Sequence, residues 1–307
     1  MQRPLEARVR IDGYTRPTAV IGWPITHSLS PVMHNAAYEA MDLNWACLPF
    51  AVRDQRALYA FIEAARQLQF VGFNVTMPHK QAVMELCDEV AALARMAGAV
   101  NTVHCVDGRL VGYNTDGRGL LEALAGDLGF DPSGKTVAVL GSGGAAAAAV
   151  AALILGRAAS LTLVNRDVDR AEALLERVSG PLRGMPVSVY PFDASAAMAV
   201  READLVINAT PVGMGVADPS PISSAWLRDG QFVFDMVYRA QPTALVSEAA
   251  AMGARACNGL GMLVAQGALA IDIWAGEDRA QAHAPRDIMR AAACAALEAR
   301  NPAGGDD

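Results

Sequence analysis

The stretch VAVLGSGGAAAAAV, residues 137–150, constrains the fold more than any other part of the sequence. A short apolar run leads into Gly141-x-Gly143-x-x-Ala146, and an alanine-rich segment that favours a helix follows. In a strand–turn–helix unit, the first glycine makes a tight turn, the second lets the backbone approach a pyrophosphate, and the third small residue allows close helix–strand packing. The stretch therefore predicts a Rossmann-type dinucleotide-binding unit, with a purely structural glycine turn as the alternative.

The same region contains an uncharged run, residues 137–156, that is long enough to suggest a membrane helix. The glycine cluster divides the run into a short strand and a short helix, so we expect no membrane span. The net charge of −7 argues against a nucleic-acid partner and gives no electrostatic reason for binding an anionic membrane. Five scattered cysteines without a C-x-x-C indicate free thiols, and the N-terminus lacks the apolar core of a signal peptide, so we expect a cytoplasmic protein.

Short apolar runs alternate with amphipathic stretches along nearly the whole chain, which is the pattern of an α/β fold. With 307 residues, the chain is long enough for roughly two domains. We expect an N-terminal α/β substrate domain at residues 1–116 and a doubly wound Rossmann-type domain at 117–258. We expect the C-terminal helices, 259–307, to pack back on the first domain because their amphipathic faces need a partner.

Three local patterns predict how segments begin and turn. Ser30 is expected as the N-cap of a helix with Pro31 in its first turn. Asp107-Gly108 is a hairpin signal between two strands. Residues 79–98 are typical of a helix that breaks near its middle.

The strand LTLVNRD determines which dinucleotide we expect. It ends in Asn165-Arg166, with Arg170 one helical turn later, where an NAD site usually places a carboxylate. A planar, always charged guanidinium suits a 2′-phosphate, so NADP is favoured over NAD. Asp167 would repel that phosphate. We interpret it as the N-cap of the next helix, which leaves NAD as a weaker alternative and ordinary solvated charges as another role for the arginines.

Several further blocks together resemble the shikimate dehydrogenase family over roughly residues 18 to 275. They are VIGWPITHSLSP (20–31), GFNVTMPHK (72–80), AGAVNTV (97–103), GYNTDGRG (112–119), INATPVGM (207–214), DMVY (235–238) and GLGMLVAQG (259–267). The resemblance implies NADP-linked interconversion of 3-dehydroshikimate and shikimate, small-molecule substrates on the route to chorismate and the aromatic amino acids. The family usually has Thr or Ser where this chain has Asp167, which bears on the strictness of cofactor choice.

The resemblance also implies roles residue by residue. The substrate residues that it implies are Ser28, Ser30, Thr76, Lys80, Asn101, Asp116, Tyr238 and Gln266. The cofactor residues are Gly141, Ser142, Gly143, Gly144, Ala145, Asn165, Arg166, Arg170, Thr210, Met236 and Gly259. A small polyol acid does need short donors and acceptors of this kind. Structural alternatives remain: Ser28 and Ser30 can cap a helix, and Thr76 or Asn101 can close a turn. Gln266 can be a solvated helix residue.

Lys80 and Asp116 are the candidate catalytic residues. Oxidation of an alcohol by hydride loss requires removal of its hydroxyl proton, and reduction of the ketone requires its return. We expect the two side chains to act as a coupled acid/base pair, and a charged Lys80 would also stabilise negative charge on the oxygen. The alternative is a structural salt bridge.

Other functions remain open from the sequence. A quinate or aminoshikimate dehydrogenase with relaxed NAD/NADP preference is the nearest, followed by a binding protein without catalysis and a folate-linked dehydrogenase. The histidines match no standard zinc spacing, so we expect no metal. The oligomeric state is left as monomer or homodimer.

Overall fold

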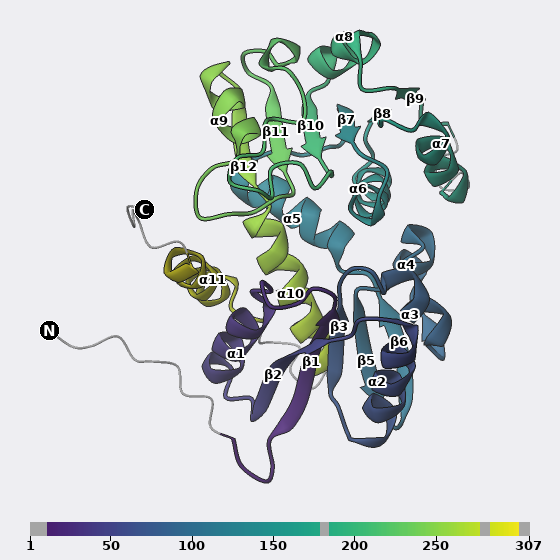
Figure 1. The fold of residues 1–307 in the computed structure, drawn as a ribbon, viewed down its shortest axis with the longest axis vertical. Coiled ribbons are helices and arrows are strands. Elements are labelled where there is room, and N and C mark those ends of the chain that lie inside the picture. The colour runs from purple at the N-terminus through teal and green to yellow at the C-terminus, as the bar shows by residue number, and fades with distance from the viewer. Residues whose placement is uncertain (1–10, 179–183, 277–282, 301–307) are drawn as a thin grey trace, which may run out of the picture. The chain divides into compact units, whose positions relative to one another are not determined.

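Two sheets organise the chain, which the computed structural model describes over residues 11–178, 184–276 and 283–300 (Figure 1). Each sheet belongs to one of two units. The first unit comprises the chain up to Arg95, Ala99–Thr115 and the chain from Gly267 onward, and the second comprises Met96–Gly98 and Asp116–Gln266. Helices and strands alternate in both, which confirms the predicted α/β class.

The first unit contains a mixed sheet. Its described strands are β1 (Arg16–Gly22), β2 (Trp45–Ala51), β3 (Gly72–Val75), β4 (Glu89–Val90), β5 (Thr102–Val106) and β6 (Arg109–Tyr113), in the order β2-β1-β3-β5-β6-β4. Strand β1 pairs in parallel with β2 and β3, whereas β5 runs antiparallel to β3 and β6. The helices described with it are α1 (Ser30–Ala40), α2 (Gln55–Gln67), α3 (Lys80–Leu86), α4 (Ala92–Ala97) and α11 (Arg286–Arg300). Helix α11 packs beside α1 (Figure 1).

One local prediction in this unit is wrong by one residue. The N-cap of α1 is Leu29, in a helical backbone conformation, so Ser30 is the first residue of the helix rather than its cap. No side chain caps the helix, although the hydroxyl of Ser28 accepts the N–H of Ser30, the first helical residue, at 3.2 Å. Pro31 lies in the first turn as predicted.

The other two local predictions are confirmed. Asp107 and Gly108 join β5 and β6 with φ of 50° and 76°, the left-handed pair that a two-residue hairpin requires. The segment 79–98 is broken as expected, into α3 and α4 with the short strand β4 between them.

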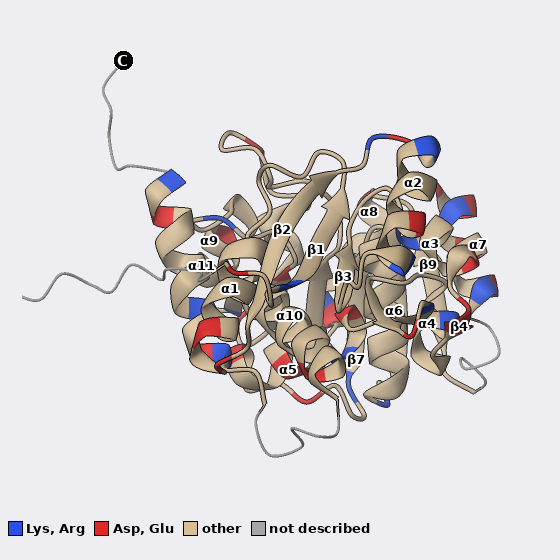
Figure 2. Cartoon of the chain, turned by 90° about the horizontal axis from the view of Figure 1, so that it is seen from below, with Lys and Arg blue, Asp and Glu red and all other residues tan. Residues whose placement is uncertain are grey.

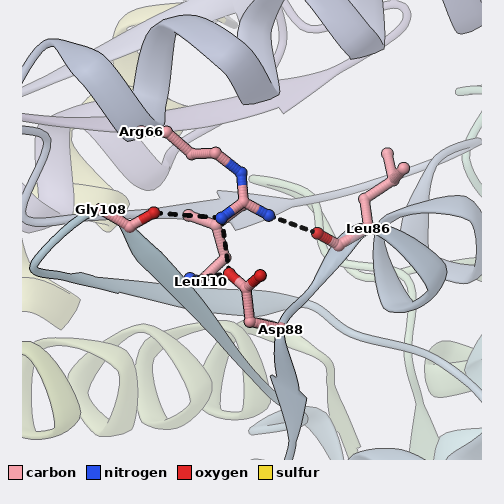
Figure 3. Close-up of polar contacts among 5 residues, drawn as sticks. All are labelled: Arg66, Leu86, Asp88, Gly108 and Leu110. Carbon is pink, nitrogen blue, oxygen red and sulfur yellow. Dashed lines mark hydrogen bonds and ion pairs between the residues drawn. The ribbon is translucent and has the colours of Figure 1, made fainter.

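A charged clamp ties the hairpin to neighbouring elements (Figure 3). Arg66 on α2 donates from Nη1 to Asp88 Oδ2 at 2.5 Å and to the carbonyl of Gly108 at 3.0 Å, and from Nη2 to the carbonyl of Leu86 at 3.0 Å. Asp88 Oδ2 also accepts the N–H of Leu110 at 2.7 Å. The hydrogen bond from Arg66 lowers the pKa of the Asp88 carboxyl. One guanidinium therefore holds three segments of the first unit.

Replacing this arginine tests the clamp. Arg66→Met is expected to lower the free energy of unfolding by about 1 kcal/mol at neutral pH, since the ion pair is partly exposed. The pKa of Asp88 is lower in the folded state than in the unfolded state. The ion pair therefore adds to the free energy of unfolding at a pH above the unfolded-state pKa, and this contribution is lost as the pH falls through the folded-state pKa. Urea denaturation at neutral and acid pH measures both effects, with Arg56→Met on the same helix as control. If Arg66→Met lowered the free energy of unfolding equally at the two pH values, the effect could not come from the ion pair with the Asp88 carboxylate.

The second unit contains a parallel sheet. Its described strands are β7 (Thr136–Leu140), β8 (Ser160–Val164), β9 (Val187–Tyr190), β10 (Leu205–Asn208), β11 (Phe232–Asp235) and β12 (Arg255–Asn258). Their order, β12-β11-β10-β7-β8-β9, is that of a doubly wound Rossmann sheet. The accompanying helices are α5 (Asp116–Leu128), α6 (Gly144–Leu155), α7 (Val168–Arg177), α8 (Ala194–Glu202) and α9 (Ala244–Ala251), with a 3₁₀ turn η1 (Ser224–Trp226). Helix α10 (Leu260–Ala275) begins in the second unit and continues into the first from Gly267.

Burial explains the long uncharged run in the sequence. Strand β7 is a core strand, and residues 146–153 of α6 are all buried, so the helix needs no polar face. Helices α7 and α11, by contrast, carry both signs of charge (Figure 2). Among the described residues, no helix combines the length and the apolar character that crossing a bilayer requires.

Candidate functional site

The glycine turn after β7 has the geometry that a pyrophosphate site requires. Gly141 has φ of +108°, and a Cβ there would lie 3.1 Å from the carbonyl oxygen of Ala209. At Gly143 and Gly144 a Cβ would meet no described atom within 4 Å, so the backbone is open at the start of α6. Ser142 is half-buried and Ala145 is exposed on the same turn. Backbone N–H groups at a helix N-terminus bind anions, so this turn fits the phosphates of a dinucleotide.

Thr210 lies beside this turn. Strand β10 neighbours β7 in the sheet, at the point where the strand order reverses, and Thr210 Cγ2 lies 3.2 Å from the Cβ position of Gly141. Asn208 Oδ1 accepts both the N–H of Thr210 at 3.0 Å and its hydroxyl at 2.7 Å. The side chain of Asn208 therefore sets the position of Thr210.

Asn208 is in turn held by a buried carboxylate. Its amide donates to Asp235 Oδ1 at 2.8 Å, and the two residues stand opposite each other at the ends of β10 and β11. Asp235 also accepts the N–H of Val237 at 3.0 Å and the hydroxyl of Thr243 at 2.6 Å. Desolvation raises the pKa of Asp235, while its hydrogen bonds oppose the shift. Sequence reasoning missed this network, although a polar residue closing a buried strand, as in INAT and DMVY, is a visible signal.

Met236 and Gly259 lie at the same edge of the sheet. A Cβ on Gly259 would lie only 2.3 Å from the carbonyl oxygen of Met236, so only glycine permits this approach of the two backbones. Met236 is half-buried, and so is Tyr238 two residues later. The structure thus brings Met236 and Gly259 together, as it does Thr210 and Gly141.

The loop after β8 carries the predicted phosphate-binding arginines. Asp167 Oδ1 accepts the N–H of Arg170 at 3.2 Å, which confirms its predicted role as the N-cap of α7. Asn165 donates its amide to the carbonyl of Asp167 at 2.6 Å. Arg166 and Arg170 are both exposed, so their guanidinium groups are accessible to an anion at the carboxyl end of β8.

In the first unit, the segment from Thr76 to Lys80 connects β3 to α3. The N–H of Thr76 donates to the carbonyl of Ile21 at 2.9 Å, and the carbonyl of Lys80 accepts the N–H of Val100 at 2.9 Å. His79 is buried, with Nε2 at 2.7 Å from the carbonyl oxygen of Val52. The histidine therefore shapes the turn, as predicted, and Lys80 and Thr76 remain half-buried beside it.

Asn101 has a role that the sequence did not reveal. Its Nδ2 donates to Thr115 Oγ1 at 2.9 Å, and its Oδ1 accepts the N–H of Thr115 at 2.8 Å. Thr102 Oγ1 joins the same group, at 3.3 Å from Thr115 Oγ1, and accepts the amide of Asn74 at 3.0 Å. Because Asp116 follows Thr115 directly and begins α5, this network fixes the backbone from which the Asp116 side chain extends.

Gln266 and α5 meet in the second unit. A Cβ on Gly119 would lie 2.9 Å from the backbone nitrogen of Gln266, so the two helices are in close contact there. Gln266 Nε2 donates to the carbonyl of Leu263 at 2.8 Å. Asp116 is buried one helical turn before Gly119. The first turn of α5, which carries Asp116, therefore packs against the part of α10 that carries Gln266.

Two further sets of residues bear on possible cofactors and redox chemistry. Over residues 11–178, 184–276 and 283–300, no three His, Cys, Asp or Glu side chains cluster in a way that could hold a metal ion. All five cysteines lie in the described ranges, and none of them forms a disulfide.

The sheet order, the glycine turn and the arginine-bearing loop define a Rossmann-type dinucleotide-binding protein with a second α/β unit. Residues 20–103 match the shikimate dehydrogenase substrate binding domain, and residues 124–238 match shikimate / quinate 5-dehydrogenase. The chain belongs to the shikimate dehydrogenase family.

Individual relatives agree with this assignment. Shikimate dehydrogenase (NADP(+)) from Geobacter metallireducens is 46% identical over 289 residues, covering 94% of this chain and 99% of that protein. A solved shikimate dehydrogenase in complex with NADP+ is 35% identical, with a TM-score of 0.84 over 94% of this chain and 98% of that one. The Thermus thermophilus enzyme in complex with NADP(H) and shikimate is 36% identical, with a TM-score of 0.80 over 92% of this chain and 100% of that one.

Proposed function

We propose that this chain is an NADP-dependent shikimate dehydrogenase, which reversibly reduces 3-dehydroshikimate to shikimate on the route to chorismate and the aromatic amino acids. The observation that carries the proposal is similarity along nearly the full length to relatives that bear this name. The quinate and aminoshikimate alternatives are not favoured by these relatives.

The second unit is proposed to hold the cofactor. The turn from Gly141 to Ala145 would take the pyrophosphate, since it presents open backbone at a helix N-terminus. Asn165, Arg166 and Arg170 would hold the 2′-phosphate. Thr210, Met236 and Gly259 complete the cofactor residues at the same sheet edge. When bound, NADPH supplies the hydride for the reduction.

Lys80 and Asp116 are proposed to handle the proton at the reacting oxygen. A group within hydrogen-bond reach of that oxygen can serve as acid in reduction and as base in oxidation. Both residues begin helices whose backbone is anchored, Lys80 through Val100 and Asp116 through Thr115 and Asn101. That anchoring supports a catalytic role, because acid/base chemistry depends on fixed geometry.

The remaining substrate residues are proposed to bind the ring and its carboxylate. Ser28 and Ser30 would donate hydroxyl hydrogen bonds to the carboxylate, with Tyr238 near it. Asn101 and Asp116 would contact the ring hydroxyls, and Thr76 and Gln266 would also bind the substrate. Asn101 also has a structural role, because its amide donates a hydrogen bond to the hydroxyl of Thr115.

A direct assay tests the function. The purified protein, mixed with shikimate and NADP, is expected to form reduced nicotinamide, measured by absorbance, with a weaker signal from NAD. The same assay with quinate in place of shikimate tests whether the protein is a quinate dehydrogenase instead. A chain that reduced NADP with quinate but not with shikimate would overturn the proposal.

The cellular setting is proposed to be cytoplasmic, with the chain a monomer or homodimer. Five cysteines without a disulfide support a reducing compartment. Size-exclusion chromatography with light scattering would measure the number of subunits.

Cofactor choice can be tested at Asp167. Asp167→Thr keeps a capping hydroxyl for α7 and removes a negative charge beside Arg166. The variant is expected to raise the ratio of kcat/KM for NADP over NAD by about 5-fold, since one unfavourable charge near a phosphate costs about 1 kcal/mol. Asp169→Asn, on the same helix, is the control for a general change in charge. An unchanged ratio would show that Asp167 acts only as a cap.

A further inference from the structure

The last residue of α11 contacts the loop that carries Ser28. Arg300 donates from Nη1 to the carbonyl of His27 at 2.6 Å and from Nη2 to the carbonyl of Ser28 at 3.3 Å. All three residues belong to the first unit, in which α11 packs beside α1 (Figure 1). One guanidinium thus holds two successive peptide groups that lie 273 and 272 residues away along the chain.

The loop is held on its inner side by its own residues. Leu29 and Ile25 are buried, and the N–H of Ser28 donates to the carbonyl of Ile25 at 3.0 Å. These contacts fix one side of the loop. The carbonyls of His27 and Ser28 are held from α11, so Arg300 fixes the two peptide planes that flank the Cα of Ser28.

Those peptide planes determine where the hydroxyl of Ser28 points. Ser28 Oγ accepts the N–H of Ser30 at 3.2 Å, and a hydroxyl that accepts one hydrogen bond still has its own proton to donate. A carboxylate is an acceptor only, so it requires donors of this kind. A change in the backbone at Ser28 would turn this donor away from its acceptor.

We propose that Arg300 is a positioning residue for recognition of the substrate carboxylate, acting through the backbone of His27 and Ser28. The inference rests on the proposed function, because it takes Ser28 and Ser30 as the groups that bind the carboxylate. Arg300 itself need not touch the substrate.

A role in general stability is a poor explanation for this contact. Helix α11 is anchored by Met289 and Ala293, both fully buried, whereas Arg300 is exposed at the end of the helix. Removal of the guanidinium leaves that apolar packing in place. Surface contacts of this kind contribute little to the free energy of unfolding.

The test compares shikimate with its methyl ester, which lacks the negative charge and turns one carboxylate oxygen into a weakly accepting ester oxygen. Arg300→Met is expected to raise KM for shikimate about 5- to 10-fold, the effect of one misplaced hydrogen bond to a charged group. We expect kcat and KM for NADP to stay within about twofold, and KM for the ester to change little. Glu298→Gln, at another exposed position in the last turn of α11, is the control and should behave as the wild type.

Two further variants separate the mechanisms. Arg300→Lys keeps the charge but lacks the forked pair of donors, so it should recover only part of the affinity. Ser28→Ala combined with Arg300→Met should cost less than the sum of the two single changes, because both act on one hydrogen bond. An unchanged KM for shikimate, an equal rise for the ester, full recovery by lysine, or full additivity would each overturn the inference. A wild-type protein inactive with shikimate would overturn the proposed function as well, so the two failures are distinguishable.

Discussion

Replacing Lys80 by alanine is expected to lower kcat for shikimate oxidation by about 100-fold or more, the range that loss of a positioned acid/base group produces. The amine is the group proposed to exchange a proton with the reacting oxygen and to stabilise negative charge on it. KM should change less than kcat if the interaction is made mainly in the transition state. Steady-state kinetics of the purified variant measure both quantities.

The sequence offers sharp controls for this prediction. Lys80 and Lys135 are the only two lysines, so Lys135→Ala, at an exposed position, removes the other side-chain amine. Lys80→Arg keeps a cation but replaces the amine by a group that stays protonated in proteins. If Lys80→Arg kept near-normal kcat, proton transfer by Lys80 would be excluded and a purely electrostatic role would remain.

The parts of the fold that the sequence predicted are those determined by short segments. The glycine turn at Gly141, the hairpin at Asp107-Gly108 and the N-cap at Asp167 each depend on a few consecutive residues with a specific backbone requirement. The predicted N-cap at Ser30 is wrong by one residue, because Leu29 already has a helical backbone conformation and the helix begins without a side-chain cap.

The contacts that sequence could not predict join distant segments. Asn208 and Asp235 meet only because β10 and β11 are neighbours in register, and Asn101 reaches Thr115 across the hairpin. The Arg300 contact spans more than 270 residues. Such pairs depend on strand order and helix packing, which a single sequence does not specify. The candidate site was therefore predicted as a set of residues, whereas the groups that hold those residues became visible only in the structure.

Asp235→Ala is expected to lower the free energy of unfolding by about 3 kcal/mol, because it leaves buried donors without an acceptor. Those donors are the amide of Asn208, the hydroxyl of Thr243 and the N–H of Val237, and the first two belong to fully or almost fully buried side chains. Thr243 also caps α9, so the loss extends to that helix. Urea denaturation measures the effect, with Asp169→Asn at an exposed position as control.

Asp235→Asn separates hydrogen bonding from charge. The amide keeps an oxygen acceptor, so we expect a smaller loss than with alanine. Because burial raises the folded pKa of Asp235 above its unfolded value, the folded wild type binds the proton more tightly, and its stability falls as pH rises from the unfolded value through the folded one. The asparagine variant lacks this titration, so the stability of the wild type relative to the variant should decrease over that pH range. If the difference in the free energy of unfolding between the wild type and Asp235→Asn did not change with pH, the pKa of Asp235 would be the same in the folded and unfolded states, contrary to the effect of its burial.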